Sequence, residues 1–511
     1  MKKLLILFLC VILSLSSILM LSACKDKKDD NEKDSIANNE NESDNNNDDH
    51  SSDDSTNNNT SDDNQKDEVN NNNEQIGSEG LEYTLSSDGT YYILSGIGAC
   101  SDEHIVIPST YQKLPVKIID EDAFYESHIK SVVIPESIVV IKKYAFYNCA
   151  MLEKIYFNAT CMNDLSENTY IFLSDAPIEV IIGKNVTKIP SYLFNFKPYS
   201  ITGELKIKSI EFEDQGSCQI IGNYAFANAR ISKITLPDSV TRIGCGAFRS
   251  CSLLEEIKMP ENLQTIDNEA FYECRRLKEV IFPDTLSSIG KNAFYHCRSF
   301  TTITIPKSVT DIGINAFENC SKLVEIENLS ELPISLGDTN NGKITSNALN
   351  VYTDKDGSKK TFETSDGFIF YEDGDICYLL GYKGDNKFVK LPENCHGKNY
   401  EIYIEAFVNS DMHTIFIPSS VTAIKARAFI LCIHFVNIVI EDCTINVDGL
   451  SELPSGSNVN VYFLGTESEW SNNSFLKNKF NYSIKYYYSE SEPTTDGNFW
   501  HYDENGEIAV W

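Results

Sequence analysis

Residues 277–297 read LKEVIFPDTLSSIGKNAFYHC, and this segment contains each feature of a unit that recurs along the chain. A cysteine returns every 23 residues through the centre of the sequence, and an Ala-Phe pair and a proline keep the same interval. A fixed period of roughly 20–50 residues indicates a solenoid of stacked units. The regular members are Cys251, Cys274, Cys297 and Cys320, then Ala247-Phe248, Ala270-Phe271, Ala293-Phe294 and Ala316-Phe317, then Pro237, Pro260, Pro283 and Pro306.

The unit predicts a short strand, a second pair of inward residues and a short helical turn. Its first six residues match the L-x-x-L-x-L strand of a leucine-rich repeat, with Val280 and Phe282 on one face of the pleat. Pro283 cannot donate a ladder hydrogen bond and therefore ends the strand. Residues 286–289 supply a second inward pair, and residues 293–297 suit a short helical turn because positions three or four apart share a face. Neighbouring coils must cover the apolar face of such a small unit.

The same features recur outside the central block at less regular spacing. We therefore predict a leucine-rich-repeat solenoid of right-handed stacked coils, rich in β-structure with short helical turns, and a repeat of about 23 residues. The outlying Ala-Phe pairs are Ala123-Phe124, Ala145-Phe146, Ala225-Phe226, Ala406-Phe407 and Ala428-Phe429, and Cys149 and Cys432 hold the thiol position of their units.

These residues resemble the BspA-like leucine-rich-repeat family of bacterial surface proteins. The family signature is close to AF-x-x-C-x-x-L-x-x-I-x-I-P-x-S-V-T-x-I-G, and residues 247–260 and 293–313 match it closely. The resemblance covers roughly residues 80–465. It implies a surface protein, and members of the family are implicated in adhesion and in binding host or matrix proteins.

The N-terminus predicts export and lipid anchoring. Lys2 and Lys3 precede an apolar run over residues 4–21, as in a secretory signal peptide. The run ends in Leu-Ser-Ala-Cys, which looks like a bacterial lipobox, so we expect residues 1–23 to be removed and Cys24 to carry the lipid. The alternative is an uncleaved transmembrane anchor, since the apolar run approaches spanning length.

The rest of the chain divides by composition and repeat phase. Residues 24–78 are rich in Asp, Asn and Ser and lack aromatic residues, which predicts a disordered acidic tether. The solenoid is expected over 79–326 and 388–465, on either side of an insertion at 327–387 that contains a β-hairpin. The hairpin is expected to turn at Asp373-Gly374, and residues 466–511 are expected to form a C-terminal cap with a helix over 467–480 and a final hairpin over 499–511.

The net charge of the chain disfavours some classes of binding partner. The chain has 511 residues and a net charge of −32, which disfavours nucleic acid, because phosphate binding needs clustered Lys and Arg. Direct docking on anionic lipid is disfavoured for the same reason. The membrane is therefore expected as a partner only through the lipid on Cys24.

The 15 cysteines do not follow the pattern of a disulfide framework. Equivalent positions in stacked coils lie about 4.8 Å apart with parallel Cβ directions, whereas disulfides need Cβ atoms about 3.8 Å apart. We therefore expect the ladder thiols to be free and to act as small buried apolar groups, so that a Ser at Cys274 would leave a hydroxyl without a partner. Pairing stays open for the cysteines off the ladder, and no metal-binding spacing is present. They are Cys100, Cys161, Cys218, Cys245, Cys377, Cys395 and Cys443.

The sequence contains no catalytic or cofactor motif of the kinds we considered, so an enzyme is not expected. His296 beside Cys297 resembles a nucleophile and base, but the cysteine belongs to the buried ladder. The expected function is macromolecular binding at the cell surface, with extracellular, host or matrix proteins as partners. The alternatives are a structural envelope lipoprotein without a specific ligand, and a glycan-binding accessory protein that uses Trp500, Tyr502 and Trp511.

The outward face of the first strand in each coil is the candidate binding site. Its side chains should form a continuous strip, in which charges alternate with a few apolar residues, as in protein-binding surfaces. The alternative is that β-branched residues simply favour strands. The strip comprises Lys233, Thr235, Glu256, Lys258, Glu279, Ile281, Thr302 and Thr304, continued by Glu325, Glu327, Ser131, Val133, Thr414 and Phe416.

Overall fold

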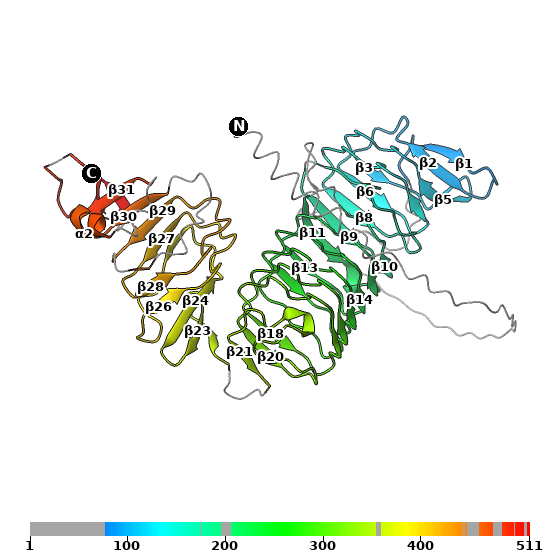
Figure 1. The fold of residues 1–511 in the computed structure, drawn as a ribbon. Coiled ribbons are helices and arrows are strands. Elements are labelled where there is room, and N and C mark those ends of the chain that lie inside the picture. The colour runs from blue at the N-terminus through cyan, green and yellow to red at the C-terminus, as the bar shows by residue number, and fades with distance from the viewer. Residues whose placement is uncertain are drawn as a thin grey trace, which may run out of the picture. The chain divides into compact units, whose positions relative to one another are not determined.

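The computed structural model describes residues 77–511 except 175, 196–205, 354–358, 443–444, 447–458, 474–482, 495 and 505–507. The predicted signal peptide, Cys24 and nearly all of the tether lie outside these residues. The described chain is a β-solenoid in which parallel strands of successive coils lie side by side (Figure 1). This confirms the predicted leucine-rich-repeat architecture.

One strand from each coil forms what we call the first column. Its strands pair in parallel and in register, so that Ile234 of one coil lies beside Ile257 of the next. Buried and exposed residues alternate along them, as the pleat requires. The column comprises β3 (His104–Val106), β6 (Ser131–Ile134), β8 (Lys154–Phe157), β9 (Ile178–Ile182), β11 (Ile207–Phe212), β13 (Lys233–Thr235), β15 (Glu256–Lys258), β18 (Thr302–Ile305), β20 (Glu325–Asn328) and β21 (Asn350–Tyr352).

A second column of short strands follows on another side of the coil. Most of its members are two residues long, with a buried isoleucine after a more exposed residue. The column comprises β5 (Leu114–Ile119), β7 (Val140–Ile141), β10 (Lys188–Ile189), β12 (Ile220–Ile221), β14 (Arg242–Ile243), β16 (Thr265–Ile266), β17 (Ser288–Ile289) and β19 (Asp311–Ile312). Before it, β1 (Glu82–Leu85) and β2 (Tyr92–Gly96) form an antiparallel pair joined to β5, and β4 (Thr110–Tyr111) also pairs with β5.

The third side of each coil, at the Ala-Phe pair, contains turns instead of the expected helical segment. The backbone amides of Asn292, Phe294 and His296 donate to carbonyls of the next coil, at 2.7 to 3.0 Å. The residues between them close short turns within their own coil. Asn292 and His296 have positive φ angles of 54° and 61°, which a helix excludes. Hydrogen bonding between coils therefore replaces the bonds within one segment that a helix would need.

The phenylalanines of the Ala-Phe pairs form a continuous stack inside the solenoid. The rings of Phe226, Phe248, Phe271, Phe294 and Phe317 have centroids 5.1 to 5.4 Å apart and are nearly parallel. Each of these side chains is at most 1% exposed. Because each ring touches the ring above and the ring below, the stack links the coils as well as filling them.

The ladder cysteines are free and buried, which confirms that part of the prediction. They are not merely apolar, however. The thiol of Cys274 donates to the carbonyl oxygen of Phe248 in the preceding coil, at 3.1 Å. The same contact recurs in other coils at 2.9 to 3.2 Å, and burial raises the pKa of the Cys149 thiol to about 11. The ladder thiols therefore stay protonated and act as donors between coils.

This geometry predicts a different outcome at Cys274 from the sequence-based expectation. A serine hydroxyl there has the Phe248 carbonyl as an acceptor, so Cys274→Ser should lower the free energy of unfolding by less than about 1 kcal/mol. Cys274→Ala removes the donor and leaves a small void, and should cost about 1–2 kcal/mol. Urea unfolding of the two variants measures this order. A serine variant less stable than the alanine variant would show that the hydrogen bond at this position does not contribute to the free energy of unfolding.

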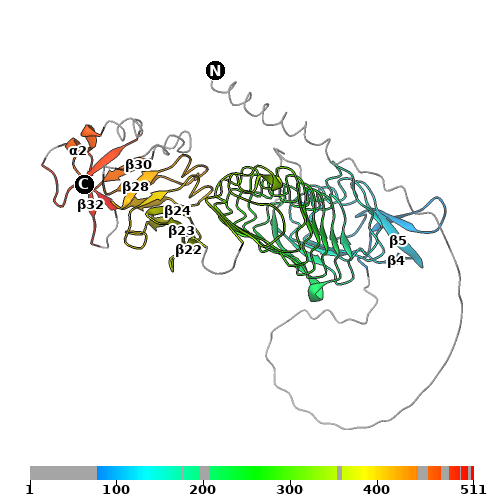
Figure 2. The same ribbon diagram turned by 60° about the horizontal axis from the view of Figure 1, so that its bottom comes forward.

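The predicted insertion contains an antiparallel sheet of β22 (Thr361–Glu363), β23 (Phe368–Asp373) and β24 (Ile376–Tyr382) (Figure 2). The β23–β24 hairpin turns one residue later than predicted. Asp373 still pairs with Ile376, so the two loop residues are Gly374, with a φ of 59°, and Asp375. Strand β24 pairs in parallel with β26 (Tyr400–Ile402), which pairs with β28 (Val421–Ile424). The hairpin thus supplies the first strand of a renewed second column.

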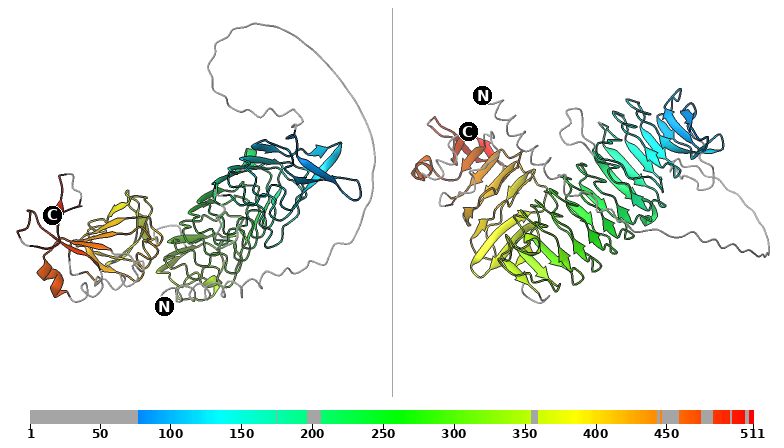
Figure 3. Two further views of the ribbon diagram at one scale, coloured as in Figure 1. Left: turned by 90° about the horizontal axis from the view of Figure 1, so that it is seen from above. Right: turned by 45° about the vertical axis from the view of Figure 1, so that its right-hand side comes forward.

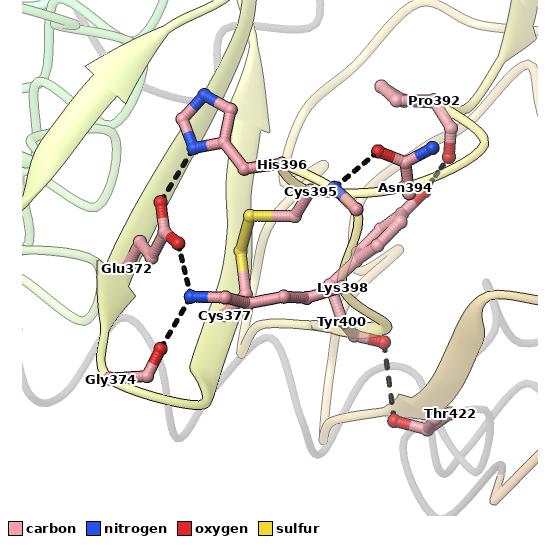
Figure 4. Close-up of a disulfide and its surroundings, with 11 residues drawn as sticks. Glu372, Gly374, Cys377, Pro392, Asn394, Cys395, His396, Lys398, Tyr400 and Thr422 are labelled. Carbon is pink, nitrogen blue, oxygen red and sulfur yellow. Dashed lines mark hydrogen bonds and ion pairs between the residues drawn. A yellow bond between two sulfur atoms is a disulfide. The ribbon is translucent and has the colours of Figure 1, made fainter.

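A disulfide joins this hairpin to the coil that follows it. Cys377 of β24 is bonded to Cys395, and both side chains are at most 3% exposed (Figure 4). Beside it, the Glu372 carboxylate accepts hydrogen bonds from His396 at 2.7 Å and from Lys398 at 2.5 Å. These two cysteines lie off the ladder, where pairing had been left open.

The disulfide should stabilise this part of the chain. Cross-linking residues 18 apart restricts the unfolded chain and contributes roughly 3 kcal/mol in the chain-entropy description. We expect the double variant Cys377→Ala/Cys395→Ala to lose about that much unfolding free energy, measured by urea unfolding without reductant. Adding dithiothreitol should destabilise the parent more than the variant. Equal urea midpoints for the parent and the variant would contradict this role.

The first column resumes after the hairpin and continues to the C-terminus (Figure 3). Its strands run in parallel beyond residue 465, into the segment expected to form a cap, and the final pair β32–β33 is an antiparallel hairpin. The expected helix is present as the short α2 (Glu467–Asn472), which a capping box at Thr466 begins. The strands are β25 (Phe388–Lys390), β27 (Thr414–Ile417), β29 (Asn437–Ile440), β30 (Asn460–Phe463), β31 (Lys485–Tyr488), β32 (Phe499–Tyr502) and β33 (Ile508–Val510).

Candidate binding surface

The outward face of the first column carries a strip of exposed side chains, which we call the ribbon. It is formed by Lys233, Thr235, Glu256, Lys258, Glu279, Ile281, Thr302 and Thr304. In β13 and β15 the outward residues are exposed and the central isoleucines are buried. Thr304 is exposed and Thr302 half-buried on β18. In-register pairing repeats these positions between β13 and β15, and the bridge from Glu256 to Glu279 carries the register into the next coil.

The charges of the ribbon pair across neighbouring coils. Lys233 lies 2.6 Å from Glu256, and this contact lowers the pKa of the glutamate. Lys258 lies 4.0 Å from Asp238. Side chains in the Lys233–Glu256 pair are more than 60% exposed, and such pairs contribute about 0–1 kcal/mol. A partner can therefore replace these contacts with its own at little cost in stability.

Ile281 is the apolar centre of the ribbon. Its side chain is 75% exposed, the largest exposed fraction for a large hydrophobic residue within the described parts of the chain. Its neighbours Val280 and Phe282 point into the core and are at most 7% exposed. Residues 279–281 form no regular strand, although Glu279 still makes a bridge to Glu256. Burying such a residue against a partner is favourable by about 25 cal/mol per Å² of apolar surface.

The ribbon ends at a small polar pocket of about 200 Å³. The Thr304 hydroxyl donates to Glu327 at 2.8 Å on its rim. Glu325, expected to point outward with the ribbon, is instead 1% exposed, because its carboxylate accepts hydrogen bonds from Asn350 and from the amides of Lys360 and Thr361. Sequence reasoning missed this pocket because Tyr352 and Lys359, which complete its wall, belong to the segment predicted as an insertion.

Phe416 does not belong to the exposed ribbon, which corrects the sequence-based prediction. It points outward from β27 as predicted, yet it is only 7% exposed. Val439, Tyr462 and Trp500 cover the outward face of this later sheet and form a small second core with it. Lys390 also lies over the Phe416 ring, 5.3 Å from its centroid. Thr414 is buried as well, so the ribbon is confined to the coils before the hairpin.

The aromatic residues proposed for glycan binding are divided between the core and the surface. Trp500 is fully buried, and its indole donates to the Phe463 carbonyl at 3.0 Å, so it packs as part of the C-terminal cap. Tyr502 and Trp511 are 38% and 44% exposed. The Trp511 ring lies 3.8 Å from His501 between centroids. Only these two of the three aromatic residues remain available to a ligand.

The described residues offer little for catalysis. Cys297 is fully buried, its thiol donates to the Phe271 carbonyl, and burial raises its pKa well above the usual value. It therefore does not act as a thiolate beside His296. Within the described residues no group of three or more His, Cys, Asp or Glu side chains is placed to hold a metal ion. The search for an apolar helix long enough to cross a membrane found none in the same residues.

Comparisons with known proteins found a family of repeat proteins that matches most of the solenoid. The family model described as a BspA type leucine rich repeat region matches residues 98–214, 219–335 and 389–486, in six copies. A leucine-rich repeat protein from Bacteroides ovatus is 20% identical over 81% of this chain and 99% of that chain, with a TM-score of 0.33. A leucine rich cell surface protein from Faecalibacterium prausnitzii is 18% identical over 78% of this chain and 97% of that chain, with a TM-score of 0.27.

The pneumococcal vaccine antigen PcpA is also similar, at 17% identity over 81% of this chain and 93% of that chain, with a TM-score of 0.24. A search of curated proteins found no match. The family model covers well over half of the chain, and the matched residues contain the recurring Ala-Phe, Cys and Ile-Pro positions. The chain therefore belongs to the BspA-type leucine-rich-repeat family.

Proposed function

We propose that this protein binds an extracellular macromolecule, in the first instance a host or matrix protein, through the ribbon. Proteins of the BspA type are surface repeat proteins, and their solenoid is typically a non-catalytic fold. The observation that carries the proposal is Ile281, a 75% exposed isoleucine that shares the ribbon with exposed charged and hydroxyl side chains. Protein-binding surfaces have this composition, with a few apolar anchors inside a polar rim.

The test compares two triple variants of matched chemistry on different sides of the solenoid. The ribbon variant is Lys258→Asp/Ile281→Ser/Thr304→Asp. The control variant is Lys307→Asp/Ile314→Ser/Thr310→Asp, whose three positions are exposed but lie outside the first column. Surface plasmon resonance with purified matrix proteins and cell-wall glycans gives the affinities, and circular dichroism checks folding.

We expect the ribbon variant to bind its protein partner at least tenfold more weakly, and the control variant to stay within twofold of the parent. Equal loss in both variants would contradict the ribbon as the site. Retention by glycans alone would favour the exposed residues Tyr502 and Trp511. No saturable binding to any probe would favour a structural envelope protein.

We also propose that Cys24 carries a lipid and anchors the protein to the membrane after removal of residues 1–23. The support is the sequence: a basic start, an apolar run and Leu-Ser-Ala-Cys at its end. Anchoring by two acyl chains is stable where one is marginal. Cys24→Ser should therefore release the protein or block its processing. A parent that stays membrane-bound with an uncleaved signal and without lipid would instead support the transmembrane alternative.

A further inference from the structure

A cleft of about 170 Å³ lies where coils before the hairpin meet segments that follow it. Its walls are Glu255, Arg276, Lys278, Ser299 and Lys322 on one side, and Ile369 with residues 381–387 and 406–412 on the other. Glu255, Asp385 and Asp411 also line it, but they are outnumbered by five basic side chains, although the chain as a whole has a net charge of −32. They are Arg276, Lys278, Lys322, Lys383 and Lys387.

Carboxylates neutralise only some of these cations. Lys278 lies 2.7 Å from Glu255, and Lys383 lies 2.7 Å from Glu363. Arg276 is more loosely held, at 3.5 Å from Glu255 and from Asp411. The remaining two ammonium groups, of Lys322 and Lys387, make no ion pair within 4.0 Å among the described residues; each donates instead to a backbone carbonyl. The acceptors are Ala406 at 3.2 Å and Asp411 at 3.1 Å.

Lys322 is the deepest of these groups. Its side chain is 7% exposed, and burial lowers the pKa of its ammonium to about 8. The nearby Glu405 carboxylate favours the charged form but is already in contact with two arginines, Arg298 and Arg427. The Glu405 carboxylate is therefore shared between these two arginines and Lys322, and it does not form an ion pair with Lys322.

The cleft is also lined by a residue with an uncharged hydrogen-bond donor, Asn409. The side-chain amide nitrogen of Asn409 is buried in the same cleft and has no hydrogen-bond acceptor among the described residues. A buried donor without an acceptor costs about 1–3 kcal/mol unless a ligand or water satisfies it. Two ammonium groups and one amide thus offer hydrogen-bond donors that the protein itself does not use fully.

We propose that this cleft binds a tetrahedral oxyanion, namely a sulfate or phosphate group, either free or as an ester on a small sugar. Charge-assisted hydrogen bonds from ammonium groups to such oxygens are among the strong ones. The volume suits one such group and part of its carrier. None of the eight ribbon residues lines the cleft, although Lys383 of its wall lies 4.0 Å from Glu279 of the ribbon. The proposal does not depend on the function proposed for the ribbon.

Isothermal titration of the full chain in detergent tests the proposal at constant ionic strength, with chloride as the reference anion. The probes are sodium sulfate, sodium phosphate and N-acetylglucosamine 6-sulfate. The first variant is Lys387→Met, at an exposed position. The second is Asn409→Asp, which keeps the shape of the side chain but replaces the amide donor with a negatively charged oxygen. The control is Lys390→Met, which removes an exposed ammonium 3.2 Å from Glu393, outside the cleft.

We expect one saturable site, at least tenfold weaker in Lys387→Met and abolished in Asn409→Asp, with the control unchanged. Tighter binding of the sulfated sugar than of sulfate would identify an ester as the natural ligand, and equal binding would identify the free ion. An absence of saturable binding in the parent, or equal affinities in the parent and both cleft variants, would overturn the proposal.

Discussion

Replacing Phe271 by alanine is expected to lower the free energy of unfolding by about 3–5 kcal/mol, the cost of a large cavity in a core that cannot collapse around it. The ring is fully buried between Phe248 and Phe294, with centroids 5.2 and 5.1 Å away. The carbonyls and amides of the same turn are bonded to both neighbouring coils. The coils therefore cannot move together to fill the space. Urea unfolding followed by circular dichroism measures the loss.

The matched control is Phe388→Ala. Phe388 also lies in a coil of the solenoid but is 50% exposed on β25. Its loss should change stability by less than about 1 kcal/mol, because exposed positions contribute little. Similar losses for Phe271→Ala and Phe388→Ala would show that the aromatic stack does not hold the coils together.

The second large effect is expected at Glu405. Its carboxylate is 1% exposed and accepts hydrogen bonds from Arg298 and Ser321, while Arg427 forms an ion pair with it. Glu405→Gln keeps the size of the side chain but removes the negative charge that faces Arg298 and Arg427. Breaking a buried pair in this way costs about 3–5 kcal/mol. The loss is measured by urea unfolding at neutral pH.

Glu401→Gln is the control for this variant. Glu401 lies 2.9 Å from Lys425, but its side chain is 31% exposed, so water can solvate the lysine that remains. The expected change is below about 1 kcal/mol. Equal unfolding free energies for the two glutamine variants would contradict the prediction, because the Glu405 ion pairs would then contribute no more than an exposed pair.

The period of the sequence was sufficient to predict the stacked coils and the first column of strands. Because Cys274, Phe271 and Pro260 return at a fixed interval, equivalent residues must stack, and the pleat then determines which neighbours of Val280 face outward. The same reasoning predicted free thiols on the ladder. These outcomes depend only on local spacing.

The remaining features depend on contacts between residues that are distant in sequence. The turn at Ala293-Phe294 takes its hydrogen bonds from the next coil, which a single unit does not reveal. Phe416 and Glu325 were expected to be exposed to solvent. Instead, Trp500 covers Phe416, and residues 360–361 cover Glu325. No periodic signal marks those covering residues. The cleft lined by basic residues likewise combines side chains from separate parts of the chain, so no local sequence pattern predicted it.

The most direct test of the ribbon is hydroxyl-radical footprinting of three isoleucines with nearly equal exposure, in the free protein and in complex with its partner. Ile281 lies on the ribbon and is 75% exposed, whereas Ile314 and Ile433, at 71% and 72%, lie elsewhere on the solenoid. The account predicts that the partner slows oxidation of Ile281 severalfold and leaves the other two unchanged. An unchanged rate at Ile281, with protection at Ile314 or Ile433, would contradict it.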